Sequence, residues 1–172
     1  MTTDEPVSDS ELRLAAMDLL ARREHARKEL TAKLTKRFRS RALSADSLES
    51  VLDRLEEEGL LSDARFAAST LRQLAGRGYG PRKVLSTLRE KGVGELAEDA
   101  LAGANDGDID WALEAEQVYL KKFRGLPISG DWEAQQKEKA KRLRFMQYRG
   151  FSAEVSAKLV NADSDSEGEL PE

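Results

Sequence analysis

The chain has 172 residues, of which 40% are hydrophobic and 35% charged, and its net charge at neutral pH is −4. It contains no cysteine and a single histidine, His25, which excludes disulfides, thiolate or multi-histidine metal sites, and Cys-His catalysis. No apolar run approaches the ~18 residues of a membrane span, and the first residues lack the features of a signal peptide, so we expect a cytoplasmic protein. No cofactor is expected.

Hydrophobic residues recur at the spacing of amphipathic helices along nearly the whole chain, and strand patterns of alternating polarity are absent from the sequence. The predicted helices run, in chain order, through residues 12–20, 30–38, 48–55, 66–74, 84–88, 96–101, 111–123, 132–146 and 155–159. The two ends of the chain, residues 1–8 and 162–172, are expected to be disordered, and the second forms an acidic tail.

Glycine, proline and capping residues mark where these helices begin and end. Gly92 and Gly150 stand where a helix C-terminus favours the left-handed conformation that glycine adopts easily. Either Ser62 or Asp63 can cap the fourth helix, and Pro81 suits the first position of the fifth.

Side chains on the helical faces give a first view of the core. The aromatic residues expected in the core are Trp111, Tyr119, Phe123, Trp132 and Phe145. His25 is expected at the surface or at a junction between helices rather than in a metal or catalytic site.

Three helix ends resemble one another, namely KLTKRF (33–38), TLREKGV (87–93) and FMQYRGF (145–151). The corresponding residues are Leu34, Leu88 and Met146, each followed three positions later by Arg37, Lys91 or Arg149. This pattern predicts three tandem three-helix repeats, at 9–60, 61–104 and 105–161. Repeats of ~50 residues must share buried surface, so we expect an all-α protein forming an elongated, curved helical array.

The charges are segregated along the chain. Basic residues gather in three stretches, 22–41, 72–91 and 137–149, whose local net charges are +7, +5 and +5. Acidic residues gather elsewhere, and the tail 161–172 has five acids and no base. A basic patch can bind phosphate even on an acidic protein, although neighbouring acidic helices can also neutralise it.

The most specific candidate site is the start of the fifth helix. Arg82 and Lys83 stand there, where the helix dipole disfavours cations by roughly 0.3–1 kcal/mol. Free amide N–H groups, the dipole and both side chains would together bind a phosphate or an acidic partner. Arg77 and Tyr79 in the preceding glycine-rich turn would reinforce the site, whereas the alternative is a solvated turn with a core tyrosine.

For the other two basic stretches, too, the sequence leaves open whether the cations bind an anionic partner or only face solvent and nearby acids. Several turns of basic helix over 21–41 fit a nucleic-acid backbone or an acidic groove, and the basic helix over 137–149 could contact phosphates or pair with nearby acids. Glu56, Glu57 and Glu58 predict an acidic face that meets a basic helix of this protein or of a partner.

The central run LEEEGLLSDARFA (55–67) and GRGYGPRKVLSTLREKGV (76–93) resembles the RecX family of recombination regulators. LLARREHARKELTAKL (19–34) and RFMQYRGF (144–151) extend the resemblance to nearly all of residues 10–160. The resemblance implies three tandem three-helix repeats and a non-enzymatic, monomeric protein that binds the RecA recombinase filament on single-stranded DNA. It also implies a regulator of homologous recombination and DNA repair that limits filament extension, strand exchange, ATP hydrolysis and the co-protease activity of the SOS response.

Ten residues are expected to contact the filament or single-stranded DNA, whether that DNA lies within the filament or is free. These are Arg22, Arg23, Arg27, Lys28, Arg77, Tyr79, Arg82, Lys83, Lys91 and Arg149. No catalytic residue and no metal ligand is expected.

The first helix end departs from the repeat pattern. It reads KRFRSRALSADS, without the glycine found at positions 92 and 150, so a longer basic connection of about six residues is expected there.

Two alternative functions remain open. One is a sequence-specific DNA-binding regulator, because three-helix units can present a recognition helix, and the other is a helical-repeat scaffold without a nucleic-acid role.

Overall fold

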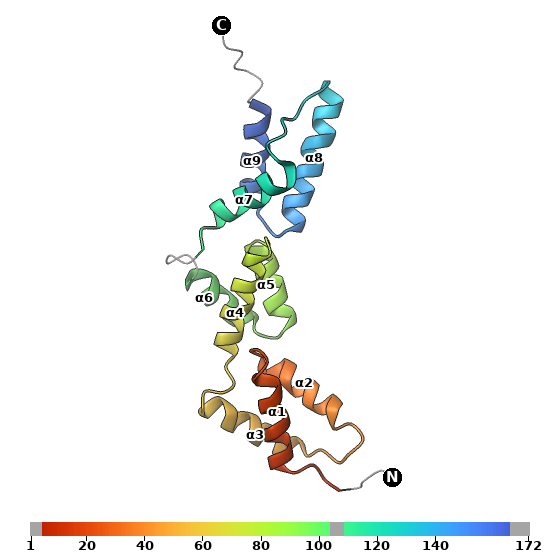
Figure 1. Cartoon of the computed structure of the whole chain (residues 1–172), viewed down its shortest axis with the longest axis vertical. Helices are drawn as coiled ribbons and strands as arrows, with labels where there is room; N and C mark the ends of the chain where they lie inside the picture. The colour runs from red at the N-terminus through yellow and green to blue at the C-terminus, as the bar shows by residue number, and fades with distance from the viewer. Residues whose placement is uncertain (1–4, 104–108, 166–172) are drawn as a thin grey trace. The chain divides into compact units, whose positions relative to one another are not determined.

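The computed structural model describes residues 5–103 and 109–165, and every regular element within these ranges is a helix (Figure 1). The elements are α1 (Asp9–Leu20), α2 (Arg27–Arg37), α3 (Ala45–Glu57), α4 (Asp63–Gly76), α5 (Pro81–Glu90), the 3₁₀ helix η1 (Gly94–Leu96), α6 (Ala97–Gly103), α7 (Trp111–Phe123), α8 (Trp132–Tyr148) and α9 (Ala153–Asp165). The predicted all-α class is confirmed, and each predicted helix is present, although Phe38 lies just beyond the end of α2.

The chain folds as two compact units. The N-terminal unit comprises the chain up to Thr70 together with Leu88–Ala97, and the C-terminal unit comprises Leu71–Thr87 together with the chain from Glu98 onward. The helices expected for the first repeat, α1–α3, therefore fall in one unit, and those expected for the third, α7–α9, fall in the other. The helices expected for the second repeat are divided between the two units.

In the N-terminal unit, α1, α2 and α3 pack around a single core (Figure 1). Leu12, Leu30, Leu34 and Leu52 are fully buried in it. These are residues that the helical spacing placed on the inner faces, and burying each such side chain stabilises the fold by about 1.5–3 kcal/mol.

Part of the segment before α1 is ordered. Val7 is buried, its N–H donates to the carbonyl of Ala42 at 3.0 Å, and the hydroxyl of Ser8 caps α1. The expected disorder of the first residues therefore does not hold for residues 5–8, whereas residues 1–4 lie outside the described part of the chain.

The three matched helix ends share a buried apolar residue in the structure. The apolar residues Leu34, Leu88 and Met146 are fully buried on α2, α5 and α8. This burial supports the tandem helical repeats that the sequence predicts.

The glycines after α5 and α8 end these helices as predicted. Gly92 has φ 78° and Gly150 has φ 99°, both in the left-handed region. In each case the next N–H reaches back five residues, from Val93 to the Leu88 carbonyl at 2.9 Å and from Phe151 to the Met146 carbonyl at 3.1 Å. This is the hydrogen-bond pattern of a Schellman helix end.

The end of α2 differs, also as predicted. Phe38 follows the helix with φ −100° instead of a left-handed glycine. The connection to α3 occupies residues 38–44, whereas residues 91–93 suffice after α5. The longer connection expected after the first helix end is therefore confirmed.

The two capping candidates before α4 have different partners. The hydroxyl of Ser62 accepts the Arg65 N–H at 3.2 Å and so caps α4. The carboxylate of Asp63 instead accepts the Arg27 N–H at 2.7 Å. Asp63 therefore caps α2, because the residue that precedes this helix, Ala26, offers no side-chain acceptor.

In the C-terminal unit, α7, α8 and α9 pack around a second core (Figure 1). Tyr119, Phe123 and Phe151 are buried there, as expected for the first two. Trp132 contradicts its prediction, since it is 76% exposed. Its spacing in the sequence places it on the buried face of the helix. It is, however, the first residue of α8, directly after the Asp131 cap, and its side chain lies in solvent.

The helix α9 is longer than predicted. Residues 162–165 are helical, although they were expected in the disordered tail, and the rest of that tail lies outside the described residues. The carboxylate of Asp163 accepts hydrogen bonds from the Tyr119 hydroxyl at 2.7 Å and from Arg142 at 2.9 Å. These bonds secure the last turn of α9 to α7 and α8.

Arg142 lies at the centre of this unit, with only 3% of its side chain exposed. It donates to Tyr119, Asp163, Glu138 and the Leu126 carbonyl, each at 2.9 Å. One guanidinium group therefore joins α7, the following loop, α8 and α9. Burial raises the pKa of Tyr119 to about 12, so its hydroxyl remains protonated and donates to Asp163.

His25 is buried, with 2% of its surface exposed, so the surface alternative is wrong; it lies in the connection between α1 and α2, as the junction alternative expects. Its Nδ1 lies 3.0 Å from the Arg23 carbonyl, and its Nε2 lies 3.1 Å from the Lys33 ammonium. A neutral imidazole satisfies both contacts, with Nδ1–H donating to the carbonyl and Nε2 accepting from Lys33. Burial lowers the pKa of His25, and the cations Arg23 and Lys33 act in the same direction, against Glu29.

This burial predicts that acid destabilises the N-terminal unit. In the unfolded chain His25 has its ordinary pKa of 6.5, whereas in the folded chain its pKa is lower, so the unfolded state binds more protons. The stabilisation is complete above pH 6.5 and falls as the pH drops, by at most about 1.4 kcal/mol per pH unit. Urea unfolding followed by circular dichroism between pH 7.5 and 5.5 measures it.

The control is His25→Gln, whose amide can donate and accept without titrating. We expect this variant to lose most of the change between pH 7.5 and 5.5. An equal pH dependence in the two proteins would contradict the assignment to His25.

Candidate functional site

The basic stretch of the N-terminal unit is largely neutralised by nearby carboxylates. Arg22 pairs with Asp18 at 3.3 Å, and Arg23 pairs with Glu29 at 2.6 Å. The continuous basic helix expected over 21–41 is also interrupted, because the chain leaves α1 and re-enters a helix only at α2. This arrangement favours neutralisation over an open phosphate-binding face.

Arg27 is the clearest case. Its guanidinium lies 2.6 Å from Glu49, 2.8 Å from Asp53 and 2.9 Å from Glu56. Burial alone would lower the pKa of Arg27, but hydrogen bonds to Asp53 and Glu49 raise it above its ordinary value. Arg27 therefore stays charged and holds α2 against α3.

The acidic face predicted at the end of α3 meets basic residues of this chain. Glu56 contacts Arg27, and Glu58 receives a two-pronged contact from Arg13, with a shortest distance of 2.6 Å. The prediction that this face meets a basic surface is confirmed for these two glutamates.

The remaining two predicted contact residues of this unit lie near each other. The side chain of Lys28 packs beneath Gly92, where an added Cβ would lie 2.6 Å from the Lys28 Cδ. The ammonium of Lys91 lies 3.9 Å from Glu29. Of the predicted contact residues in the N-terminal unit, Lys28 alone has no ion pair within the described residues.

In the C-terminal unit, the glycine-rich turn after α4 packs directly on the turn between α8 and α9. The N–H of Gly80 donates to the Arg149 carbonyl at 2.7 Å. A Cβ at Gly80 would lie 2.6 Å from the Gly150 carbonyl oxygen, and a Cβ at Gly150 would lie 2.6 Å from the Lys83 nitrogen. Glycine is required at both positions because the two backbones touch.

This contact changes the expected anion site at the start of α5. The Arg82 N–H donates to the Gly150 carbonyl at 3.0 Å, and the Lys83 N–H donates to the Gly80 carbonyl at 3.1 Å. The amides that were expected to hold an anion are therefore occupied, and that part of the prediction is wrong. The side chains of Arg82 and Lys83 are exposed and form no ion pair among the described residues.

Arg149 fastens the same turn from the other side. Its guanidinium donates to the Arg77 carbonyl at 3.2 Å and lies 5.0 Å from the ring centre of Tyr79 and 5.4 Å from that of Phe145. The Arg77 guanidinium lies 5.8 Å from the Tyr79 ring. Tyr79 is half-buried, and its ring is thus partly used in contacts with these two arginines.

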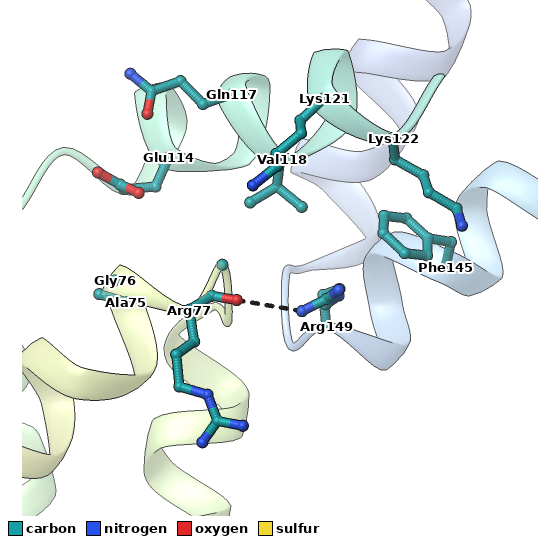
Figure 2. A pocket seen from close by; sticks show the side chains of 11 residues that line it. Ala75, Gly76, Arg77, Glu114, Gln117, Val118, Lys121, Lys122, Phe145 and Arg149 are labelled. Carbon is teal, nitrogen blue, oxygen red and sulfur yellow. Dashed lines mark hydrogen bonds between the residues drawn. The ribbon is translucent and has the colours of Figure 1, made fainter. Parts of the chain in front are cut away.

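A basic groove of about 480 Å³ opens beside this turn. Its cations are Arg77 at the end of α4, Lys121 and Lys122 on α7, and Arg149 after α8. Figure 2 shows Lys121 reaching over Val118 into the groove, and the Arg77 guanidinium pointing away from it. We call these four cations and the surface between them the basic groove.

The walls of the basic groove are mixed. Val118 and Phe145 supply apolar surface, and the Lys122 ammonium lies 5.3 Å from the Phe145 ring centre. Glu114 is the one acidic residue of the lining, and Figure 2 places it at the other end of α7 from Lys122.

The structure thus brings together Arg77 and Arg149 from the predicted set and adds Lys121 and Lys122, which sequence reasoning missed. These lysines stand in the last turn of α7, where the helix dipole favours cations, so their position carried no sign of function. The available signal was their spacing from Val118, three and four residues on, which puts all three on one helix face.

The two units differ in how their cations are used. No cation of the basic groove forms an ion pair within the described residues, whereas most cations of the first basic stretch are paired. Within 137–149, Lys137, Lys141 and Arg142 pair with carboxylates of α8 itself, and Arg142 also pairs with α9. The unpaired positive charge available to an anionic partner is therefore greatest around the basic groove.

The described residues show nothing that would hold a metal ion, since no group of three or more His, Asp or Glu side chains converges there. The helices of the described part of the chain include none that is long and apolar enough to cross a membrane. The chemistry that the basic groove offers is the binding of an anion through charge and shape.

Comparisons with known proteins agree on one family. A profile of the second three-helix domain of RecX matches residues 62–101. A regulatory protein RecX of Pseudomonas entomophila is 39% identical over 158 residues, which is 92% of this chain and 93% of that protein. One from Pseudomonas fluorescens strain SBW25 is 42% identical over 151 residues, covering 87% and 90%.

Two solved structures share the fold. A crystal structure of regulatory protein RecX superposes with a TM-score of 0.68 at 23% identity, covering 89% of this chain and 73% of that one. The structure of RecX from Lactobacillus salivarius gives a TM-score of 0.70 at 19% identity, covering 90% and 95%. At these identities the likeness shows the architecture of tandem helical repeats, not the function.

Proposed function

Because the chain belongs to the RecX family of regulatory proteins, we propose that it regulates the RecA recombinase by binding the RecA filament on single-stranded DNA. In this proposal it limits filament extension, strand exchange, ATP hydrolysis and co-protease activity. It acts as a monomer, without catalysis and without a cofactor, by occupying a surface that the filament needs.

The observation that carries the proposal is the unpaired positive charge of the C-terminal unit. A filament on DNA presents phosphates, and cations that lack a partner within the protein gain most from meeting them. Arg77, Lys121, Lys122 and Arg149 line the basic groove, and exposed Arg82 and Lys83 lie on the adjoining start of α5. Of the predicted contact residues, we therefore assign the main role to those of the C-terminal unit.

The predicted contacts of the N-terminal unit receive a smaller role. Arg22, Arg23, Arg27 and Lys91 already have carboxylate partners, so binding an external anion would require breaking those pairs. Exposed pairs contribute only about 0–1 kcal/mol, so Arg22 can exchange partners, but Arg27 contacts three carboxylates and cannot do so readily.

The proposal predicts inhibition of RecA ATP hydrolysis on single-stranded DNA at micromolar concentrations of this protein. Reversing two charges at Arg82→Glu and Lys83→Glu should raise the concentration for half inhibition roughly tenfold, because it replaces attraction to phosphate with repulsion. A steady-state ATPase titration with wild-type and variant proteins measures both effects.

The matched control reverses Lys36 and Arg39, two exposed cations of the N-terminal unit that form no ion pair within the described residues. This control should inhibit like the wild type. The absence of any inhibition by micromolar wild-type protein would contradict the proposed function itself.

A further inference from the structure

We propose that the basic groove selects guanine among the bases of single-stranded DNA, and that Glu114 is the residue that recognises this base. The inference rests on the proposed function for the kind of polymer that enters the groove. It goes further by assigning a base preference to a surface whose cations alone would bind the phosphates of any sequence.

The inference starts from an acidic side chain without a partner in a groove of cations. Glu114 is half-buried and forms no ion pair or side-chain hydrogen bond within the described residues. The positions one helical turn before and after it, 110, 111, 117 and 118, carry no cation that could pair with it along α7. A carboxylate in this place weakens the binding of any phosphate, so a groove that only collects phosphates does not explain it.

The stability of α7 does not explain Glu114 either, because the start of this helix is already capped. The carboxylate of Asp110 accepts the N–H groups of Ala112 and Leu113 at 3.0 and 3.1 Å. An acid in the first turn adds a favourable dipole contact of about 0.3–1 kcal/mol, but this contact does not require that the side chain face the groove.

The opposite charges of the groove lie at its two ends. Lys121 and Lys122 stand seven and eight residues after Glu114, which is about 10–12 Å along the axis of α7. Figure 2 shows the Glu114 carboxylate and the Lys121 ammonium below α7, with Val118 between their positions on the helix. A nucleotide has the matching order, with an anionic phosphate at one end and the hydrogen-bonding edge of its base at the other.

The surface between these ends suits a flat ring. Val118 supplies an apolar side chain on α7, and Ala75 and Gly76 line the groove from the end of α4. A Cβ added at Gly76 would meet no atom within 4 Å, so there is open space beside this residue. The groove volume of about 480 Å³ lies in the range of about 300–1,000 Å³ that small-ligand sites have.

The chemistry of a carboxylate selects one base. Guanine presents two adjacent donors on its Watson–Crick edge, N1–H and the N2 amino group. Adenine and cytosine each place a donor beside an acceptor on that edge, and thymine places one donor between two acceptors. Both oxygens of an ionised carboxylate only accept, so Glu114 matches guanine and meets an acceptor on every other base.

The experiment measures the affinity of the full-length protein for labelled single strands made of TTG, TTA or TTC repeats. The test variant is Glu114→Gln. The matched control is Glu116→Gln, which removes the same charge from an exposed position of α7 outside the groove lining. Because both variants lose one negative charge, the quantity compared is the ratio of affinities between repeats within each protein.

We expect the wild type to bind TTG repeats about five- to thirtyfold more tightly than TTA or TTC repeats, the lower part of the range for a two-pronged contact with one base. Glu114→Gln should abolish this preference for guanine, because one end of an amide donates and would face a guanine donor. Glu116→Gln should keep the preference.

A third variant tests the phosphate end of the groove. Lys121→Gln with Lys122→Gln should weaken binding to all three repeats by about the same factor and leave the guanine preference in place. Contacts to phosphate carry no sequence information directly, which is why only the total affinity should change.

A free guanine nucleotide offers the same two groups, a phosphate and a guanine edge. We expect GTP to displace the labelled TTG repeat only at millimolar concentration, since one nucleotide lacks the neighbouring phosphates of a strand. Displacement by micromolar GTP, but not by ATP, would overturn the assignment to DNA in favour of a free nucleotide.

The remaining outcomes separate the inference from the proposed function. Equal affinity for the three repeats, free or coated with RecA, overturns the inference even if the protein inhibits RecA, and so does a lack of binding to all of them. An equal loss of filament binding on every repeat in Glu114→Gln also overturns it, because Glu114 would then meet a cation of RecA. A guanine preference that depends on Glu114, without inhibition of RecA or binding to its filament, supports the inference and contradicts the proposed function.

Discussion

Replacing Arg142 with methionine is expected to lower the free energy of unfolding of the C-terminal unit by about 3 kcal/mol. The guanidinium is almost fully buried and donates four hydrogen bonds, each of 2.9 Å, to groups on three helices and a loop. Methionine fills a similar volume but leaves all four acceptors without this donor. We take the lower end of the range for broken buried pairs because Glu138 and Asp163 are 31% and 25% exposed.

The measurement is urea unfolding followed by tryptophan fluorescence. Both tryptophans of the chain, Trp111 and Trp132, belong to the C-terminal unit, so their signal follows that unit. The matched control is Arg144→Met on the same helix, because Arg144 is exposed and forms no ion pair within the described residues. A loss below about 1 kcal/mol for Arg142→Met, or an equal loss for Arg144→Met, would contradict the central role of Arg142.

The helices and their ends were predictable because their causes are local. Leu12, Leu34 and Leu88 follow helical spacing and are buried, and Gly92 and Gly150 adopt the left-handed conformation that ends a helix. The repeat was predictable for the same reason, since the matched apolar residues Leu34, Leu88 and Met146 are each buried near a helix end.

The partners of the charged residues were not predictable, because they depend on contacts between distant segments. Arg142 looked like one more cation of a basic helix, and its partner Asp163 lay in the expected tail. Asp63 stood at the start of its own helix but caps another one, 36 residues earlier in the chain. Trp132 has the spacing of a core residue, yet it stands at the first position of its helix, in solvent.

The candidate site was only partly predictable for a related reason. The sequence identified Arg82 and Lys83 as cations whose position stability does not explain. The structure agrees, since their side chains are exposed and form no ion pair within the described residues. The amides beside them were expected to be free, but the Gly150 carbonyl, 68 residues later in the chain, occupies the Arg82 amide. Lys121 and Lys122 attracted no attention because their positions suit the helix dipole, and only folding places them across from Arg149.

Neutralising the basic groove is expected to have the largest effect on binding. The variant Lys121→Gln with Lys122→Gln removes two of the four groove cations and leaves shorter, neutral polar side chains in their place. If each lysine contacts a phosphate, affinity for the RecA filament on single-stranded DNA should fall roughly tenfold or more, and the salt dependence should weaken by about one unit of slope per lysine. Stability should change little, since a dipole contact of an exposed lysine contributes about 0.3–1 kcal/mol.

A salt titration of binding to RecA-coated single-stranded DNA tests whether the basic groove is the main surface that contacts the filament. It compares three proteins: the wild type, Lys121→Gln with Lys122→Gln, and Lys36→Gln with Arg39→Gln, which removes the same charge from the N-terminal unit. We expect a loss of affinity and a shallower dependence of log Kd on log salt for the groove variant alone. Equal slopes and affinities in the two variants would contradict it, because the basic groove would then bind the filament no better than any other positive surface of the chain.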